Sequence, residues 1–136
     1  MAEKFKFLKE LIESDPFLKY VSIHVIEMEN GYAKLSMEFR NEITRIGNMV
    51  NGGAIATLAD AAGGASVLSL MEGKNQVTVT LNIEFLEPIM EGPVVAEARV
   101  IRKGKHLVFS EIDIFDGKKK LCAHANGIWF FLNFKN

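Results

Sequence analysis

The chain lacks the features that mark several common classes of protein. Its 136 residues include one cysteine, Cys122, so no disulfide can form within the chain. The formal net charge is -1, without the basic charge that favours nucleic acid and without an acidic tail. No apolar stretch reaches the ~18 residues that a membrane-spanning helix needs. We therefore expect no disulfide framework, no nucleic-acid partner and no membrane.

Targeting signals and several catalytic signatures are missing as well. The start, Met1–Phe7, carries charges where a secretory signal has an apolar run, which together with the lone cysteine predicts a cytoplasmic protein. There is no Gly-x-Ser-x-Gly elbow and no phosphate loop. His24, His106 and His124 have no Cys, Asp or Glu at ligand spacing, so we expect no metal site.

The length and composition predict one domain over residues 1–136, with a real core. Apolar periodicity and turn signals such as Asn30-Gly31 divide it into elements. The predicted elements are a helix over 3–13 within an N-terminal segment 1–15, strands over 20–28 and 32–39, a loop over 41–50, a helix over 52–72, and strands over roughly 76–86, 93–103, 106–116 and 119–131.

Residues 51–65 are a run of small residues with one carboxylate, Asp60, in the middle. A surface helix would carry several charges, whereas a buried helix leaves Asp60 unexplained. Asn51 is placed to cap this helix. Gly52-Gly53 leaves bare backbone amides at its start, where a small anion or a polarised carbonyl can reach them. The pattern therefore indicates a catalytic element.

The order of elements predicts an α+β fold. A curved antiparallel sheet wrapped around one long central helix is the simplest way to bury residues 53–71. The alanines and glycines of this helix would let the sheet approach closely.

The chain resembles the hotdog-fold acyl-CoA thioesterases of the phenylacetate-pathway (PaaI-like) type. That family opens its central helix with His-Gly-Gly and has an Asp seven residues after the second Gly, which Asn51-Gly52-Gly53 and Asp60 match in spacing. The segment Val77–Pro88 also resembles the family's next strand, with its Ser or Thr, Asn, aromatic and Pro. The similarity covers roughly residues 20–131, the expected hotdog core. Asn51 departs from the pattern, because Asn keeps a donor but cannot titrate as His does.

The resemblance implies hydrolysis of an acyl-CoA to a free acid and CoA, without a cofactor, since CoA belongs to the substrate. The Gly52 amide, aided by Gly53, would face the thioester oxygen, and Asn51 would help to position it. Asp60 would activate water or attack the carbonyl, and Thr78 would hold the water. Gly53 and Asp60 lie roughly 10 Å apart along one helix, too far to serve the same thioester. The family solves this by sharing each site across a dimer, and we expect a dimer or tetramer, with the tetramer favoured.

Structural roles are the alternatives at these positions. Gly52-Gly53 could serve only close packing, Asp60 could bond Thr57 or nearby backbone, and Thr78 could follow strand propensity alone. Three cations, Arg102, Lys103 and Lys105, surround a predicted turn. They could bind the phosphates of CoA or form a solvated hairpin tip.

Two other functions stay open on the same fold. A non-catalytic acyl-CoA or lipid binder is the first, because Asn51 replaces the family His. A hotdog dehydratase or hydratase ranks below it, because those relatives pair an acid with a His. Here no His follows Asp60 on the helix, and Asn51 removes the one that would precede it.

Overall fold

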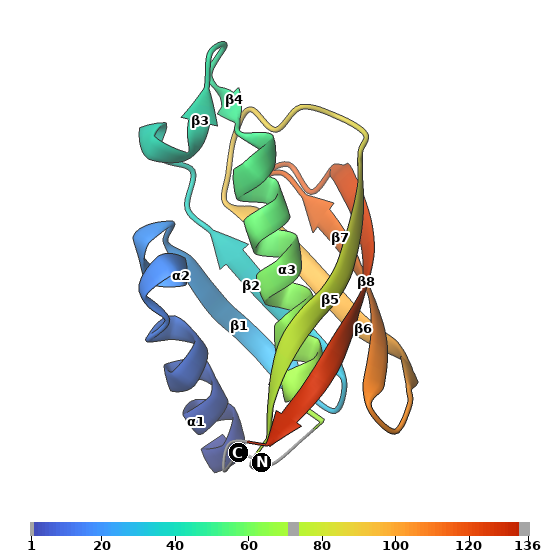
Figure 1. Cartoon of the computed structure of the whole chain (residues 1–136). Coiled ribbons are helices and arrows are strands. Elements are labelled where there is room, and N and C mark those ends of the chain that lie inside the picture. Colours follow the sequence, from blue (N-terminus) through green and yellow to red (C-terminus); the bar gives the residue numbers. More distant parts are fainter. Residues whose placement is uncertain (1, 71–73, 134–136) are drawn as a thin grey trace.

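The computed structural model describes residues 2–70 and 74–133, in which one antiparallel sheet curves around the long helix α3 (Figure 1). Its six strands follow the order β1-β2-β6-β7-β8-β5, so β1 and β5 are the edges. The expected α+β architecture is confirmed. Among the described residues, no helix is long and apolar enough to cross a membrane. The elements are α1 (Ala2–Glu13), α2 (Pro16–Tyr20), β1 (Ile23–Glu29), β2 (Tyr32–Met37), η1 (Asn41–Ile43), β3 (Thr44–Arg45), β4 (Met49–Val50), α3 (Gly52–Leu68), β5 (Lys74–Phe85), β6 (Val94–Lys103), β7 (Leu107–Phe115) and β8 (Leu121–Asn133).

Small residues let α3 lie directly on the sheet. Residues 62–68 of the helix are all buried. A Cβ at Gly63 would overlap the ring of Trp129 on β8, a side chain with no exposed surface. Gly127 leaves room for the same ring. The predicted close approach between helix and sheet is therefore confirmed.

The predicted end of the central helix is wrong. We expected it to continue to residue 72, but α3 ends at Leu68, and residues 71–73 lie outside the described part of the chain. The Ser69 hydroxyl donates to Ser66 O and accepts from the Gly31 amide, both within 2.8 Å. This side chain ties the helix end to the β1–β2 turn, a contact that local sequence patterns do not contain.

Four short elements, α2, η1, β3 and β4, were not predicted. Residue 20, expected to begin a strand, ends the helix α2, and β1 starts at Ile23. Asp15 caps α2 and Pro16 occupies its first turn, so the residues interpreted as a stop for α1 also start a second helix. In the predicted loop 41–50, β3 and β4 form a small hairpin around Gly47, whose φ is +96°.

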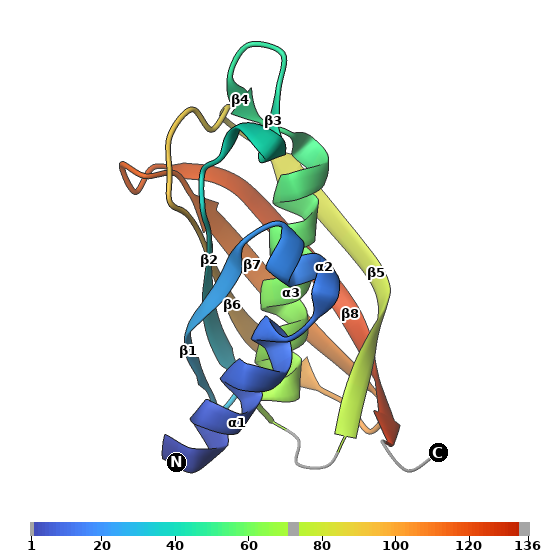
Figure 2. The same ribbon diagram turned by 90° about the vertical axis from the view of Figure 1, so that its left-hand side faces the viewer.

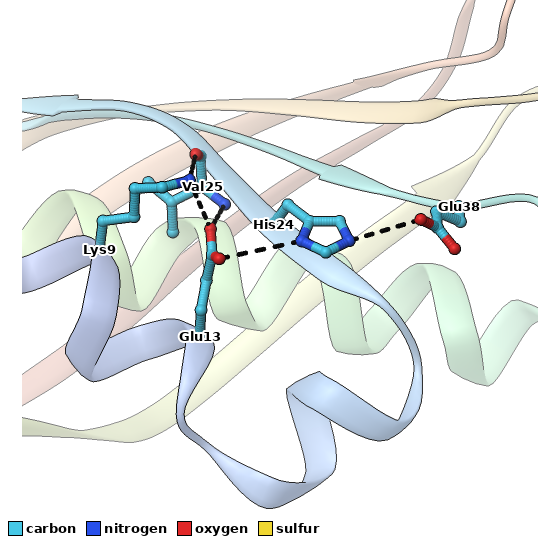
Figure 3. Close-up of polar contacts among 5 residues, drawn as sticks. All are labelled: Lys9, Glu13, His24, Val25 and Glu38. Carbon is cyan, nitrogen blue, oxygen red and sulfur yellow. Dashed lines mark hydrogen bonds and ion pairs between the residues drawn. The ribbon is translucent and has the colours of Figure 1, made fainter.

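The N-terminal helices pack against edge strand β1; Figure 2 shows them in front of α3. Glu13 accepts hydrogen bonds from the Val25 amide at 2.7 Å and from Lys9 Nζ at 2.8 Å. Lys9 Nζ also donates to Val25 O at 2.9 Å. We call these three bonds the Lys9–Glu13 clasp (Figure 3). The clasp satisfies backbone groups that an edge strand would otherwise leave unpaired.

Candidate active site

Asp60 of α3 and Thr78 of β5 meet on one side of the central helix. Thr78 Oγ1 donates a hydrogen bond to Asp60 Oδ1 at 2.6 Å. The register of β5 against β8 slips directly after Thr78, where Val79 has no partner, and such bulges re-aim neighbouring side chains. Asp60 is half-buried and Thr78 is exposed. The carboxylate expected in a buried helix therefore has both a partner and access to solvent, because one face of this half of α3 is not covered by its own chain.

The start of α3 presents one free amide rather than two. Asn51 is the N-cap, as predicted: its Oδ1 accepts a hydrogen bond from the Gly53 amide at 2.7 Å. That bond occupies the Gly53 amide. Within residues 2–70 and 74–133, the Gly52 amide has no acceptor. Gly52 therefore offers an unused donor at the positive end of the helix dipole.

Gly52 and Asp60 open onto different hollows of the same chain. A hollow of about 300 Å³ at the helix start is lined by Gly52, Arg45 and Phe85, among others. A larger one, about 510 Å³, contains Asp60 and extends between α3 and the N-terminal helices. Asp60 lies eight positions after Gly52 on the helix, or about 12 Å along the axis. One chain does not bring the two groups together.

The three expected cations also stand apart in this chain. Arg102 and Lys103 end β6, Lys105 lies in the turn before β7, and all three are exposed. This turn is at the opposite end of the sheet from the start of α3 (Figure 1). None of the three is among the described residues that line the hollows at Gly52 and Asp60.

Two features were missed by sequence reasoning, one of them at the Asp60 hollow. Helix α2 contributes Phe17 and Leu18 to the Asp60 hollow, and its signal was the Asp15-Pro16 pair. The histidines also have acidic neighbours: His24 Nδ1 is 3.9 Å from Glu13, and its Nε2 is 3.6 Å from Glu38 (Figure 3). His124 Nδ1 is 2.7 Å from Asp113 on β7.

Those acidic neighbours of the histidines come from other helices and strands, so spacing along the sequence does not reveal them. In the described ranges, no three His, Cys, Asp or Glu side chains gather as metal ligands would.

The first half of α3 and strand β5 form a continuous open surface. Gly53 is exposed, and Ala56, Thr57 and Ala61 are only half-buried. Strand β5 is a sheet edge, and Val77, Val79 and Phe85 are exposed along it. A long apolar edge strand is a template for pairing with another chain.

Comparison with known proteins gives the same family in sequence and in structure. The profile of the thioesterase superfamily matches residues 47–123. A protein of Saccharolobus solfataricus named "Putative esterase SSO1253" is 38% identical over 122 residues, covering 90% of this chain and 81% of that protein. A "Putative esterase" of Thermoplasma volcanium is 37% identical over 123 residues, covering 90% of this chain and 92% of its own.

Solved structures share the whole fold. PaaI of Escherichia coli, from the phenylacetic acid degradation operon, superposes with a TM-score of 0.84 at 26% identity, covering 91% of this chain and 89% of that chain. A thioesterase of Haemophilus influenzae gives a TM-score of 0.88 at 22% identity, covering 97% of this chain and 92% of its own, which shows the fold alone. Thioester hydrolysis in general is the activity that the superfamily profile and the named relatives support. The chain belongs to the thioesterase superfamily and has the hotdog fold of its PaaI-like members.

Proposed function

We propose that this protein is a cytoplasmic acyl-CoA thioesterase that needs no cofactor, with each active site shared between two subunits. The observation that carries the proposal is the hydrogen-bonded pair of Asp60 and Thr78 beside an open hollow. The unused Gly52 amide at the start of the same helix supplies the second requirement, a donor for an oxyanion.

The chemistry follows from these groups. The thioester oxygen accepts a hydrogen bond from the Gly52 amide, where the helix dipole also favours negative charge. Thr78 donates its own hydrogen to Asp60, so its lone pairs remain available to hold a water. Water adds to the carbonyl carbon as its proton passes to Asp60. Collapse of the tetrahedral intermediate breaks the carbon–sulfur bond, and the CoA thiolate takes that proton.

Direct attack by the Asp60 carboxylate is the alternative first step: the carbon–sulfur bond breaks, the CoA thiolate leaves, and the mixed anhydride is then cleaved by water to the free acid and Asp60. Oxygen from water can enter Asp60 only by the anhydride route, when water attacks the Asp60 carbonyl, so labelled Asp60 after turnover would identify that route.

The open surface on α3 and β5 supports a shared site. A second copy related by two-fold symmetry would cover the bare edge of β5 and the small residues of α3. If the two α3 helices run antiparallel, Gly52 of the partner subunit approaches Asp60. Pairs of such dimers would form the expected tetramer.

The principal test is release of free thiol from a panel of acyl-CoAs by wild type and by Asp60→Asn. Cys122 is buried, and burial raises the pKa of its thiol, so the protein adds little background to a thiol reagent. We expect turnover by the wild type and loss of turnover in the variant with folding intact. Tight binding of acyl-CoA without turnover would contradict the enzyme and favour the non-catalytic binder.

A mixed dimer tests the shared site. Gly52→Pro removes one amide hydrogen, and the first helical position tolerates proline. Asn51, at φ -62° and ψ 135°, already has the conformation that precedes proline. Gly52→Ala keeps the amide and is the matched control. We expect Gly52→Pro to lower kcat by about 10²-fold, as loss of one oxyanion donor does.

Chains of Gly52→Pro and Asp60→Asn are then co-assembled. In each mixed dimer, one site has both intact groups, so a random mixture should recover about a quarter of wild-type activity. A site contained in one chain would recover none.

The exposed Arg102, Lys103 and Lys105 are proposed to bind CoA phosphates from the outer surface of the assembly. Replacing all three with alanine should raise KM, and the effect should shrink in high salt. An unchanged KM at low salt would leave these residues as a solvated turn.

A further inference from the structure

We propose that α1 and α2 form one wall of the acyl-chain pocket beside Asp60, and that Phe17 sets the length of acyl group that this pocket accepts. The inference rests on the proposed function. It adds to that function which part of the substrate, the acyl chain or the CoA moiety, lies in the hollow at Asp60.

The hollow has the size and lining of a small-molecule site. Its volume of about 510 Å³ lies within the usual range for ligand pockets. Asp60 is part of it, so a thioester carbonyl placed at Asp60 directs its acyl group into this space. Its apolar lining comes from two sides, with Leu11, Phe17 and Leu18 on the N-terminal helices and Ala61, Ala65 and Leu68 on α3.

The charges that line the hollow at Asp60 favour the acyl chain over the phosphates of CoA. The described lining of this hollow contains two acids, Asp15 and Asp60, and neither Lys nor Arg. Such a space repels the phosphates of CoA but accepts an uncharged hydrocarbon tail. The hollow at the start of α3 contains Arg45 instead. The acyl chain, rather than the CoA moiety, therefore fits the hollow at Asp60.

Phe17 stands on a fixed backbone. The Asp15 carboxylate accepts hydrogen bonds from the amides of Phe17 at 3.0 Å and Leu18 at 3.2 Å. Pro16 restricts the turn further. The Phe17 ring is nevertheless 57% exposed, so its size is not required by the core of this chain. Because the backbone is held, the volume of this side chain determines how far the pocket extends.

The Lys9–Glu13 clasp holds the wall against the sheet. Glu13 is near the end of α1, two residues before the cap of α2. Its bonds to Lys9 and to the Val25 amide therefore fix the point where the two helices join (Figure 3). This makes Glu13 a positioning residue, which acts on the substrate through the wall and not by contact.

The test is the chain-length profile of kcat/KM with acyl-CoAs from acetyl to palmitoyl. Phe17→Ala should move the optimum to longer chains, with about a tenfold gain for long over short substrates, the scale set by added methylenes in a pocket. Phe17→Trp should move it to shorter chains. Phe7→Ala is the matched control, because Phe7 is 62% exposed on α1 and outside the described lining of the hollow. Profiles of both Phe17 variants that equal the control would overturn the inference.

Binding separates this inference from the proposed hydrolysis. Non-hydrolysable thioether analogues of the same acyl-CoAs are titrated by calorimetry into wild type and the Phe17 variants. If no substrate is hydrolysed but the preferred length still shifts with Phe17, the proposed function fails and the pocket stands. If hydrolysis occurs and neither readout shifts, the pocket fails alone. No binding and no hydrolysis would overturn both.

A separate set of variants tests the positioning role of Glu13. Glu13→Ala should flatten the chain-length profile while the kcat for a short substrate stays within about twofold, because the wall loosens but Asp60 does not move. Glu13→Gln keeps an acceptor for the Val25 amide and should restore much of the discrimination. Glu10→Ala removes the same charge from an exposed position on α1 and serves as the control. Equal profiles for Glu13→Ala and Glu10→Ala would exclude the positioning role.

Discussion

The two halves of α3 have similar small residues but different surroundings. In the second half, Gly63 lies against Trp129, and the chain's own sheet requires glycine there. In the first half, a Cβ at Gly52 would meet only the Phe85 ring at an ordinary 3.7 Å, so this fold does not require glycine at that position. The small residues of the buried half serve packing within one chain. Those of the open half leave room for something outside it, which we propose to be a second subunit and a thioester.

The largest expected effect is on catalysis by Asp60, which lies in the first half of α3. Asp60→Asn should reduce kcat by about 10³-fold, within the range for loss of a general base. The free energy of unfolding should change little, because Asn can still accept the hydrogen bond from Thr78. Steady-state thiol release and urea unfolding measure the two quantities. Retention of more than a tenth of the activity would remove Asp60 from the mechanism.

A pair of glycine variants tests the contrast between the halves directly. Gly63→Ala should cost about 1–3 kcal/mol of stability, because the added methyl group overpacks the core at Trp129. Gly52→Ala should stay within about 0.5 kcal/mol, because the added methyl group would meet the Phe85 ring only at an ordinary 3.7 Å. Urea unfolding at a fixed protein concentration compares them. Equal losses would contradict this difference in packing between the two halves.

Asn51 caps the start of α3, so its loss should affect the stability of the whole helix as well as the first half. Asn51→Ala should lower stability by about 1 kcal/mol through loss of the bond to the Gly53 amide. Asn51→Ser, which can still cap, should restore most of that loss. If Asn51→Ser restores stability without restoring kcat, the side chain has a part in catalysis beyond capping.

The smallest expected effect concerns pH and the Lys9–Glu13 clasp. Burial raises the pKa of Glu13, but hydrogen bonds from Lys9 and the Val25 amide and the nearby charges of Lys9 and His24 outweigh it, leaving the pKa below its ordinary 4.5. A carboxyl group whose pKa is lower in the folded than in the unfolded protein stabilises the fold at pH values above its unfolded pKa. This stabilisation is lost as the pH falls through the folded pKa. The difference in free energy of unfolding between wild type and Glu13→Gln should therefore be constant near neutral pH. It should shrink as the pH falls below 4.5. Unfolding curves at several pH values measure it, and a gap that widens in acid would contradict the assignment.

Much of the fold was predictable because its signals are local. Alternating strands, the Asn30-Gly31 turn and the run of small residues around Asp60 all persist over several residues. The cap at Asn51 was predictable for the same reason. The pairing of Asp60 with Thr78 was suggested by resemblance to a family, since no local pattern joins positions 18 residues apart.

Other features depend on contacts between distant segments. The end of α3 depends on Ser69 reaching Gly31, and the clasp depends on Glu13 reaching β1. Even the choice between the Gly52 and Gly53 amides required the structure, because it turns on where one Asn51 oxygen points. Sequence patterns identify the groups able to react, whereas the fold decides which of them are already engaged.

The bare edge of β5 has a consequence for the cell as well as for the site. If half of each active centre belongs to another chain, catalytic output follows the concentration of assembled pairs, by mass action. Below the dissociation constant of the dimer, doubling the amount of protein would raise the rate about fourfold. The abundance of the protein would then regulate it, because sparse chains would fold but remain idle.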